Sequence, residues 1–344
     1  MELGISTFAE LTPDPQLGTT LTPQQRMKNL MEEIKLSDQI GLDVYAIGEH
    51  HRPDFVVSSP ATVLAAAAVV TKQIKLSSAV TVLGSEDPVR VFQQFAHVDL
   101  LSEGRAEIMA GRGSFIESFP LFGQELELYD EIFAEKLELL LQLNQTEKIN
   151  WRGKYRPSIP NRGVYPRPFQ PEIPVWLAVG GTPQSVVRAA EKGMPLALAI
   201  IGGNPERFTY FTDLYRKAWV EQGRDLDAIQ IAVHSHGFIG ENSQQAADDF
   251  YGPYAWVMTQ LGKERGWPPM SKNQYDAMRS PEGSLVLGSP QEVIDKILMQ
   301  QEMMGLTRYL LHLSVGTMPH DKLMKAIELY GDVVAPAVRK ALAK

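Results

Sequence analysis

Residues 75–115 read KLSSAVTVLGSEDPVRVFQQFAHVDLLSEGRAEIMAGRGSF, and this stretch decides the fold. Its first part, residues 76–83, is an apolar run interrupted only by small hydroxyl side chains, which is typical of a buried parallel strand. A Gly-Ser pair then turns the chain. Asp87 can cap a helix, and Pro88 suits the first helical position, where the missing N–H would be unpaired anyway.

A helix and a second strand complete the stretch. Val91, Phe92, Phe95 and Val98 form an apolar stripe at helical spacing. A Ser-Glu-Gly sequence ends the helix, and residues 105–110 run into the next strand. The pattern therefore predicts a strand–helix–strand unit.

A short turn, Gly111-Arg112-Gly113, lies just past the end of the second strand. Glycine carries no Cβ that would crowd the backbone, and an arginine can bind a phosphate through paired N–H groups. The turn thus predicts a phosphate site at the carboxyl end of a parallel strand. A solvated arginine in a turn is the ordinary alternative.

The rest of the chain continues the alternation of strands and helices. Further strands are predicted at residues 2–8, 43–48, 173–179, 196–201, 229–239 and 308–315, and further helices at 24–40, 61–70, 130–143, 183–192, 205–222, 290–304 and 320–343. Eight strands without a strong internal repeat or a linker-like break favour one (β/α)8 TIM barrel domain, residues 1–344, over a doubly wound sheet.

Two insertions interrupt this alternation, one after the fourth strand and one after the seventh. The first, residues 114–172, combines a helix with proline-rich chain that reads as a small hairpin and an extended loop. The second, residues 240–284, is predicted to hold a helix over 244–265 that breaks near Gly252-Pro253, followed by an irregular loop. Long insertions of this kind are often functional, so the second is a candidate lid.

Composition narrows the function. The net charge of −8 argues against nucleic acid and anionic membranes as partners. The chain has no cysteine, which excludes disulfides, thiolate catalysis and cysteine-bound zinc. The start of the chain reads as a strand and not as a secretory signal, and the apolar run at 61–70 is shorter than the ~20 residues that span a bilayer. We therefore expect a cytoplasmic protein.

Chemistry in such a barrel lies at the carboxyl ends of the strands. The chain places Glu49-His50-His51, Gly180-Gly181 and His234-Ser235-His236 there, together with the turn around Arg112. Neighbouring side chains on a strand point to opposite faces, so at most one of His50 and His51 faces a site. His234 and His236 share a face and could pack, contact a substrate or bind a metal. We expect His97 to be structural, His312 to lie in the core and His320 to be exposed.

The segments VLGSEDPVR and DLLSEGRAE and the GRG turn resemble the bacterial luciferase-like family of flavin-dependent monooxygenases, and further segments match in the same order. The resemblance implies a (β/α)8 barrel that uses reduced FMN, supplied by a separate flavin reductase, and molecular oxygen to oxygenate a small organic substrate. From the sequence alone Ala79-Val80 is core strand. The resemblance implies that this pair lies under the flavin ring, often through a non-prolyl cis peptide.

The same resemblance assigns the other site residues. Arg112 pairs with the FMN phosphate, and the helix start around Gly180, Gly181, Thr182 and Ser185 supplies the second half of that site, because free N–H groups there attract an anion. His50 supports catalysis at the reactive edge of the flavin, since an imidazole exchanges protons near neutral pH. His236 is the second catalytic candidate. No metal is expected.

Other functions stay open at this point. They are a deazaflavin-dependent oxidoreductase on the same fold, a flavin-binding protein without turnover, and a metal-dependent barrel hydrolase that uses His50, His234 and His236 as ligands. The chain has no phosphate-binding P-loop and no G-x-G-x-x-G after a strand, which argues against nicotinamide binding through a Rossmann fold. The nearly all-apolar helix at 61–70 needs cover on more than one side and predicts a homodimer.

Overall fold

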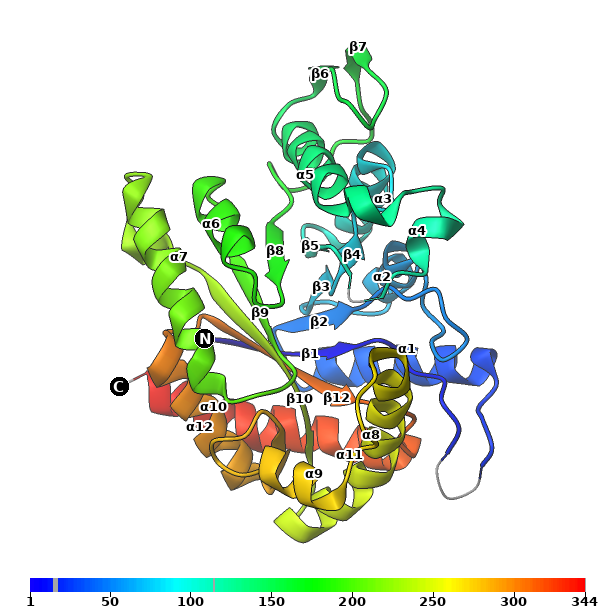
Figure 1. Ribbon diagram of the computed structural model, residues 1–344, viewed down its shortest axis with the longest axis vertical. Helices are drawn as coiled ribbons and strands as arrows, with labels where there is room; N and C mark the ends of the chain where they lie inside the picture. Colours follow the sequence, from blue (N-terminus) through cyan, green and yellow to red (C-terminus); the bar gives the residue numbers. More distant parts are fainter. Residues whose placement is uncertain (15–17, 114, 344) are drawn as a thin grey trace.

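The computed structural model describes residues 1–14, 18–113 and 115–343, and its parallel strands close into a barrel surrounded by helices (Figure 1). Within these residues the barrel strands, in spatial order, are β1 (Glu2–Thr7), β2 (Val44–Ile47), β3 (Lys75–Ser78), β5 (Ala106–Gly111), β8 (Val175–Val179), β9 (Leu196–Ile200), β10 (Ile231–Ile239) and β12 (Arg308–Ser314). Strand β10 pairs with both β9 and β12, and β12 pairs with β1, so the sheet has no open edge. The predicted (β/α)8 TIM barrel is confirmed.

Helices follow the strands as predicted. They are α1 (Pro23–Gln39), α2 (Pro60–Ala68), α3 (Pro88–Ser102), α5 (Tyr129–Gln145), α6 (Pro183–Glu191), η2 (Pro205–Phe208), α7 (Thr209–Glu221), η3 (Leu226–Ala228), α10 (Pro290–Met304), α11 (His320–Leu329), η4 (Tyr330–Val334) and α12 (Ala335–Leu342). Asp87 caps α3 by accepting from the backbone N–H of Val89 at 2.8 Å, as its sequence position indicates. Ser289 and Glu292 form a reciprocal capping box at the start of α10.

The strand predicted over residues 76–83 is divided in two. Strand β3 ends at Ser78, and a short β4 (Thr81–Val82) resumes against β5. Ala79-Val80 lies between them and is joined by a cis peptide bond, as the family resemblance implied. At this point the Ser78 hydroxyl links the two strands in place of a backbone carbonyl. Its oxygen accepts from the backbone N–H of Met109 on β5 at 3.1 Å and from the Thr81 hydroxyl at 2.9 Å.

The first insertion lies between β5 and β8. Ser114, its first residue, is outside the described part of the chain. The remainder contains α4 (Ser118–Leu121), η1 (Leu126–Leu128), α5 and the predicted hairpin, formed by β6 (Lys148–Trp151) and β7 (Ile159–Gly163). The hairpin stands away from the barrel at the top of Figure 1.

The second insertion differs from its prediction. Helix α8 (Ser243–Arg265) runs on through Pro253 without the expected break, and the expected irregular loop contains α9 (Lys272–Met278). Phe250 and Tyr254 lie on either side of Pro253. The Phe250 ring stacks on Phe238 of β10 at 5.8 Å, and the Tyr254 ring contacts Tyr275 of α9 at 6.0 Å, so tertiary packing holds the helix across the proline. A short strand, β11 (Val286–Gly288), extends the sheet beside β10 and was missed.

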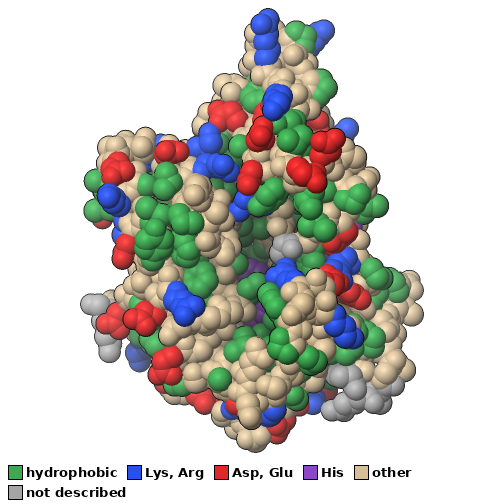
Figure 2. Space-filling model, viewed as in Figure 1, with side chains coloured by type: hydrophobic (Ala, Val, Ile, Leu, Met, Phe, Trp, Pro, Cys, Tyr) green, Lys and Arg blue, Asp and Glu red, His purple; other side chains and the backbone are tan. Residues whose placement is uncertain are grey.

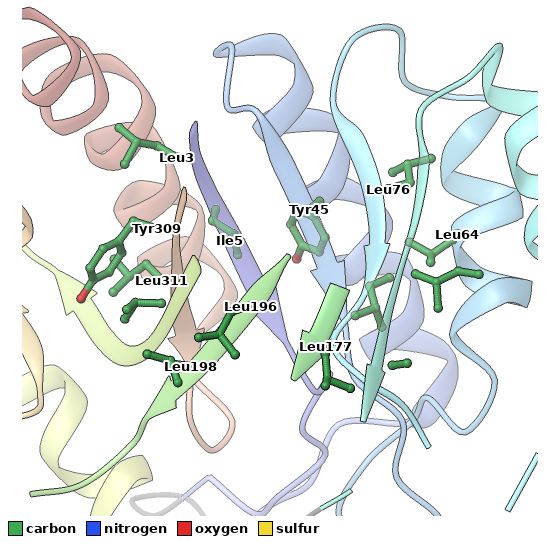
Figure 3. Packing of buried hydrophobic residues seen from close by; sticks show 14 of the residues in the cluster. Leu3, Ile5, Tyr45, Leu64, Leu76, Leu177, Leu196, Leu198, Tyr309 and Leu311 are labelled. Carbon is green, nitrogen blue, oxygen red and sulfur yellow. The ribbon is translucent and has the colours of Figure 1, made fainter. Parts of the chain in front are cut away.

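Alternation along the strands divides the barrel into two cores. Side chains that point outward pack against the helices; they include Leu3, Ile5, Tyr45, Leu76, Leu177, Leu196, Leu198, Tyr309 and Leu311 (Figure 3). Side chains that point inward form a smaller apolar layer, made of Val44, Ala46, Met109, Trp176, Ala197, Ala232 and Leu310 with Ala79. This inner layer is the floor on which the site rests.

A buried ion pair fills the barrel below this floor. The Arg308 guanidinium donates to both carboxylate oxygens of Glu107, at 2.6 and 2.9 Å, and its Nε donates to Glu2 at 2.7 Å. It also lies 4.2 Å from the centre of the Trp176 ring. The side chains of Arg308 and Glu107 are 2% and 4% exposed, so each charge depends on the other for stabilisation.

We predict that Arg308→Met lowers the free energy of unfolding by about 3–5 kcal/mol, because it leaves the Glu107 carboxylate buried without its main partner. Urea unfolding measures the change. The double variant Arg308→Met with Glu107→Leu should lose less than the single variant, since no unpaired charge remains. A single variant within about 1 kcal/mol of the parent would show that the pair does not stabilise the fold.

Candidate active site at the carboxyl ends of the barrel strands

The interior above the floor is open. Figure 2 shows a hollow in one face of the molecule with histidine side chains at its base. Small inward-facing residues explain the space, because Ala178 on β8 and Ala199 on β9 are only half-buried although they belong to barrel strands. Val80 is also half-buried. The open part of the interior therefore lies beside β3, β8 and β9.

The two halves of the predicted phosphate site meet at this mouth. The Arg112 side chain, just after β5, donates to the Thr182 hydroxyl at 3.0 Å, although 70 positions separate them. Arg112 also donates to the Tyr129 hydroxyl at 2.8 Å and pairs with Asp130. These contacts hold the guanidinium in place, so Arg112 is not simply solvated in a turn.

The backbone around Thr182 is open to an approaching anion. Gly180 is exposed, and a Cβ added there would meet no atom within 4 Å. Gly181 has φ +120°, a conformation that favours glycine. Helix α6 begins directly afterwards, and the buried Ser185 lies in its first turn. The predicted residues are thus gathered at one helix start, facing Arg112.

Val80 sits in a cradle made by two glycines. A Cβ on Gly111 would come within 2.8 Å of the Val80 methyl groups. A Cβ on Gly48 would come within 2.3 Å of the Phe8 ring and within 3.1 Å of the Ala79 carbonyl oxygen. Larger residues at these glycines would therefore push the Ala79-Val80 segment out of place. The arrangement leaves a small apolar surface at the mouth, which fits one face of a planar ring.

The Glu49-His50-His51 segment divides as strand geometry predicts. The Glu49 carboxylate pairs with Nε2 of His51 at 3.0 Å and accepts from the Val82 N–H at 2.9 Å. His50 points the other way, into an aromatic pocket with ring centres of Phe8, Phe55 and Phe115 at 4.5, 4.3 and 4.8 Å. Of the two histidines, His50 is the one that is buried in this pocket.

The pKa values of His50 and His51 are shifted in opposite directions. Burial, with smaller effects from His312 and nearby cations, lowers the pKa of His50 to about 3, so this ring is neutral near pH 7. Its Nε2 atom is buried without a hydrogen-bond partner in the described residues. A hydrogen bond to Glu49 raises the pKa of His51. His50 therefore carries an unused polar atom in an apolar setting.

A polar layer crosses the interior beside the open space. His234 and His236 point inward from β10, as predicted, and His312 joins them from β12 with ring centres 5.1 and 5.3 Å away. Nδ1 of His236 is buried and has no partner among the described residues. Burial and the nearby His312 lower the pKa of His234 to about 3 and that of His236 well below its usual value.

Sequence reasoning missed part of this layer. Ser6 on β1 contacts both His234 and His312, and Glu10, beyond the end of β1, pairs with Nε2 of His312 at 3.0 Å. Each of these residues is common in loops and strands, and no local pattern distinguishes them. The one feature of the sequence that could have indicated Glu10 is its position, since it is an acidic residue three positions after the end of β1.

The remaining histidines lie elsewhere. His97 is exposed on α3, where its Nδ1 contacts the Gln93 carbonyl of its own helix. His320 pairs with Glu32 at 2.9 Å at the start of α11. Within the described residues no group of three or more histidine, aspartate or glutamate side chains could hold a metal ion. The metal-dependent hydrolase therefore has no ligand set in this part of the chain.

A guanidinium that faces a helix start, an apolar surface and two imidazoles with unpartnered nitrogens meet at the end of the TIM barrel that carries active sites in enzymes of this fold. A family model described as luciferase-like monooxygenase matches residues 1–307, and the chain belongs to this family. It is an oxidoreductase of the monooxygenase class.

Two curated relatives differ in their cofactor. The oxygenase component of the flavin-dependent trigonelline monooxygenase of Acinetobacter baylyi is 24% identical over 341 residues, 92% of each chain. The F420-dependent glucose-6-phosphate dehydrogenase of Amycolatopsis mediterranei is 28% identical over 167 residues, 45% of this chain and 48% of the relative.

Solved structures share the fold over nearly the whole chain. The monooxygenase RslO1 from Streptomyces bottropensis has a TM-score of 0.84 at 22% identity, with 98% of this chain and 99% of that chain covered. The oxygenating constituent of 3,6-diketocamphane monooxygenase from Pseudomonas putida, in complex with FMN, has a TM-score of 0.77 at 19% identity, with 98% of both chains covered. Within the described residues, no helix has the length and apolar character needed to cross a membrane.

The low pKa of His50 predicts an acid-labile fold. The unfolded chain binds a proton on this ring below its usual pKa of 6.5, whereas the folded ring stays neutral down to about 3. As the pH is lowered from 6.5 towards 3, the free energy of unfolding should therefore decrease, and His50 should contribute up to about 1.4 kcal/mol of this decrease per pH unit. His50→Gln removes this contribution, so its stability should depend less on pH in urea unfolding between pH 6 and pH 4.

His97→Gln is the matched control, since it removes an exposed imidazole from α3. It should keep the pH dependence of the parent. Equal slopes for His50→Gln and the parent would contradict the assignment of a neutral His50.

Proposed function

We propose that this protein is an FMN-dependent monooxygenase that uses reduced FMN and molecular oxygen to oxygenate a small organic substrate. The observation that carries the proposal is the meeting of Arg112 with Thr182 beside the open interior. A paired guanidinium, a hydroxyl and a helix start form a site for a phosphate group. The adjacent apolar surface at Ala79 and Val80 suits the ring of the same cofactor.

The residues present fit an FMN molecule in one orientation. Arg112, Gly180, Gly181, Thr182 and Ser185 would hold the phosphate, and the ring would lie on Ala79-Val80 with its edge toward His50. When bound in its reduced form, FMN supplies the electrons that activate oxygen, chemistry that no side chain of this chain provides.

The chain's own residues then do three things. His50, neutral and without a partner at Nε2, offers a hydrogen bond or a proton site at the ring edge. Its aromatic surroundings keep water away from that edge. His236 of β10 has a buried Nδ1 without a partner among the described residues, which can contact the substrate.

The second insertion is placed to act as a lid. Arg52, just after His51, donates to the Glu264 carboxylate at 2.8 Å and so joins the last turn of α8 to the segment that carries His50. This ion pair is partly exposed and therefore weak, which suits a contact that opens and closes.

A reductase partner follows from the same chemistry. The relative in Acinetobacter baylyi is named an oxygenase component, which supports a separate supplier of reduced flavin here as well. The small side chains Ala178 and Ala199 leave room for a substrate inside the barrel. We propose a transient flavin reductase as partner and the cytoplasm as the location.

A deazaflavin-dependent oxidoreductase is the second candidate, because one relative is an F420-dependent dehydrogenase. Deazaflavin has a carbon in place of one ring nitrogen of flavin, next to the carbon to which oxygen adds, so the two cofactors differ in the ring and the phosphate site alone does not choose between them. Titration of the protein with oxidised FMN, reduced FMN and F420 separates the two. Tighter binding of F420 than of FMN would favour the second candidate.

The phosphate site makes a prediction about cofactor binding. Riboflavin has the ring of FMN without the phosphate, so Arg112→Ala should weaken FMN by roughly ten- to a hundred-fold and leave riboflavin nearly unchanged, since a charge-assisted hydrogen bond contributes about 1.5–3 kcal/mol. Fluorescence titration measures both dissociation constants. Arg112→Lys should restore binding only in part, because it keeps the charge and loses the paired geometry.

Arg162→Ala is the control, since Arg162 is exposed on the β6–β7 hairpin. It should bind both ligands as the parent does. Equal weakening of FMN and riboflavin in Arg112→Ala would assign Arg112 to the fold or the ring pocket and not to the phosphate.

We also propose a homodimer, with an interface smaller than the whole apolar helix at residues 61–70 on which the sequence prediction was based. The monomer already buries most of α2. What stays exposed is an apolar patch at the adjoining ends of α2 and α3, made of Val69, Val70, Leu100 and Leu101, each at least 43% exposed. Arg105 joins the two helix ends by donating to carbonyl oxygens of Ala68 and Ser102.

Light scattering should therefore give twice the chain mass of 38.3 kDa at micromolar concentration. Leu101→Glu places a charge in the apolar patch and should shift the mass toward that of one chain. Leu226→Glu, at an exposed position away from this patch, should leave the mass unchanged. A parent protein with the mass of a single chain would contradict the dimer.

A further inference from the structure

Four polar side chains inside the barrel form one continuous hydrogen-bonded chain. Nε2 of His234 lies 2.9 Å from the Ser6 hydroxyl, which lies 3.2 Å from Nδ1 of His312. Nε2 of His312 lies 3.0 Å from Oε1 of Glu10. Strands β10, β12 and β1 are neighbours in the barrel, so the chain crosses three strands from the open interior to a carboxylate on the far side.

Every member of this chain is protected from bulk water. His234 is 9% exposed, Glu10 is 2% exposed, and Ser6 and His312 are fully buried. His234 lies beside the half-buried Ala199 of β9, with which it is in register. Its ring therefore borders the open interior, whereas Glu10 lies behind it, away from that space.

The partners of Glu10 set the direction of the hydrogen bonds. The Ser314 hydroxyl donates to Oε2 of Glu10 at 3.0 Å, and the Arg26 guanidinium, which donates to the Glu10 carbonyl oxygen, adds a nearby positive charge. Both side-chain oxygens of Glu10 therefore face hydrogen-bonding groups, Oε2 the Ser314 hydroxyl and Oε1 the Nε2 atom of His312. A carboxylate only accepts, so His312 donates from Nε2 and leaves Nδ1 as an acceptor.

The same reasoning fixes the rest of the chain. The Ser6 hydroxyl donates to Nδ1 of His312, and it can then accept from Nε2 of His234. Nε2 of His234 also lies 3.2 Å from Nδ1 of His312 and can donate to it directly, which leaves the same two tautomers. In this arrangement each imidazole carries its proton on Nε2. Nδ1 of His234 remains as the acceptor at the end that borders the open interior. The low pKa that burial gives His234 agrees with a neutral ring.

We propose that Glu10, His312, Ser6 and His234 form a proton relay that connects the open interior of the barrel with Glu10. Nδ1 of His234 takes up one proton from a bound group, and its Nε2 proton passes to Ser6. The Ser6 proton passes to Nδ1 of His312, and the Nε2 proton of His312 passes to Glu10. One proton enters and one carboxylate becomes a carboxylic acid, while both imidazoles stay neutral and exchange tautomers.

The far end of the relay has an outlet. Ser314, which contacts Glu10, also lines a cavity of about 10 Å³ together with Arg26, Glu33 and His320. That volume is close to the smallest that holds a water molecule. The His320 side chain is 27% exposed, so the cavity lies near the surface beside α11. A proton on Glu10 can thus leave without crossing the open interior.

The inference rests on the proposed function, since that function places the reaction inside the barrel. Its first test needs neither flavin nor turnover. Nitrogen-15 NMR of the histidine rings in the apoprotein at pH 7, assigned with single-histidine variants, should show neutral Nε2–H tautomers for His234 and His312. A ring of either residue that carries its proton on Nδ1, or on both nitrogens, would overturn the relay.

The second test follows proton movement. Exchange of the His312 Nε2 proton with solvent should become at least about tenfold slower in Glu10→Gln, which keeps the shape of the side chain and cannot take up the proton. Ser235→Ala is the matched control, because it removes a buried hydroxyl from the outward face of β10. Unchanged exchange in Glu10→Gln would also overturn the relay.

The third test links the relay to turnover. In the flavin-loaded enzyme, Glu10→Gln and Ser6→Ala should lower the rate about a hundred-fold while the dissociation constant of FMN stays within about twofold. A parent enzyme without turnover on any flavin contradicts the proposed function, and the apoprotein tests still decide the relay. Normal turnover in both variants would overturn the relay and leave the proposed function intact.

Discussion

The buried pair of Arg308 and Glu107 determines which end of the barrel can carry chemistry. Each side chain is almost fully enclosed, and together with the Trp176 ring they fill the amino end of the interior. In a closed barrel the backbone groups of the strands hydrogen-bond to neighbouring strands, so side chains alone determine which parts of the interior are filled. With the amino end occupied by an ion pair whose partners need one another, space for a ligand remains only at the carboxyl ends.

The interior changes character in steps from that end to the mouth. Above the ion pair comes an apolar floor that includes Met109 and Leu310, and above the floor comes a layer with His234 and His312. Alanines on β8 and β9 face this layer and leave it open on one side. Hydrogen bonds join His234 and His312 into a chain, whereas Nε2 of His50 and Nδ1 of His236 are buried without a partner among the described residues.

The sequence predicted what depends on local pattern. Residues 75–115 specify strand, cap, helix and strand through apolar spacing and through Asp87, and the structure follows them closely. The pairing of Arg112 with Thr182 followed from the rule that parallel strands end at one edge. The continuous helix through Pro253 and the contact of Glu10 with His312 did not, because both depend on residues of other elements. Phe238 of β10 packs on Phe250, and Glu10 and His312 are 302 positions apart, so no local pattern identifies either contact.

Cofactor binding and proton transfer are assigned to different strands of the barrel. The proposed phosphate site lies at the end of β5 and the start of α6, whereas the proposed relay belongs to β1, β10 and β12. Open interior lies between them, bordered by Ala199 next to His234 and by Val80 next to Gly111. Groups that share no partner usually contribute additively. We therefore expect changes at Arg112 to alter cofactor affinity, and changes at Glu10 to alter proton movement, independently of each other.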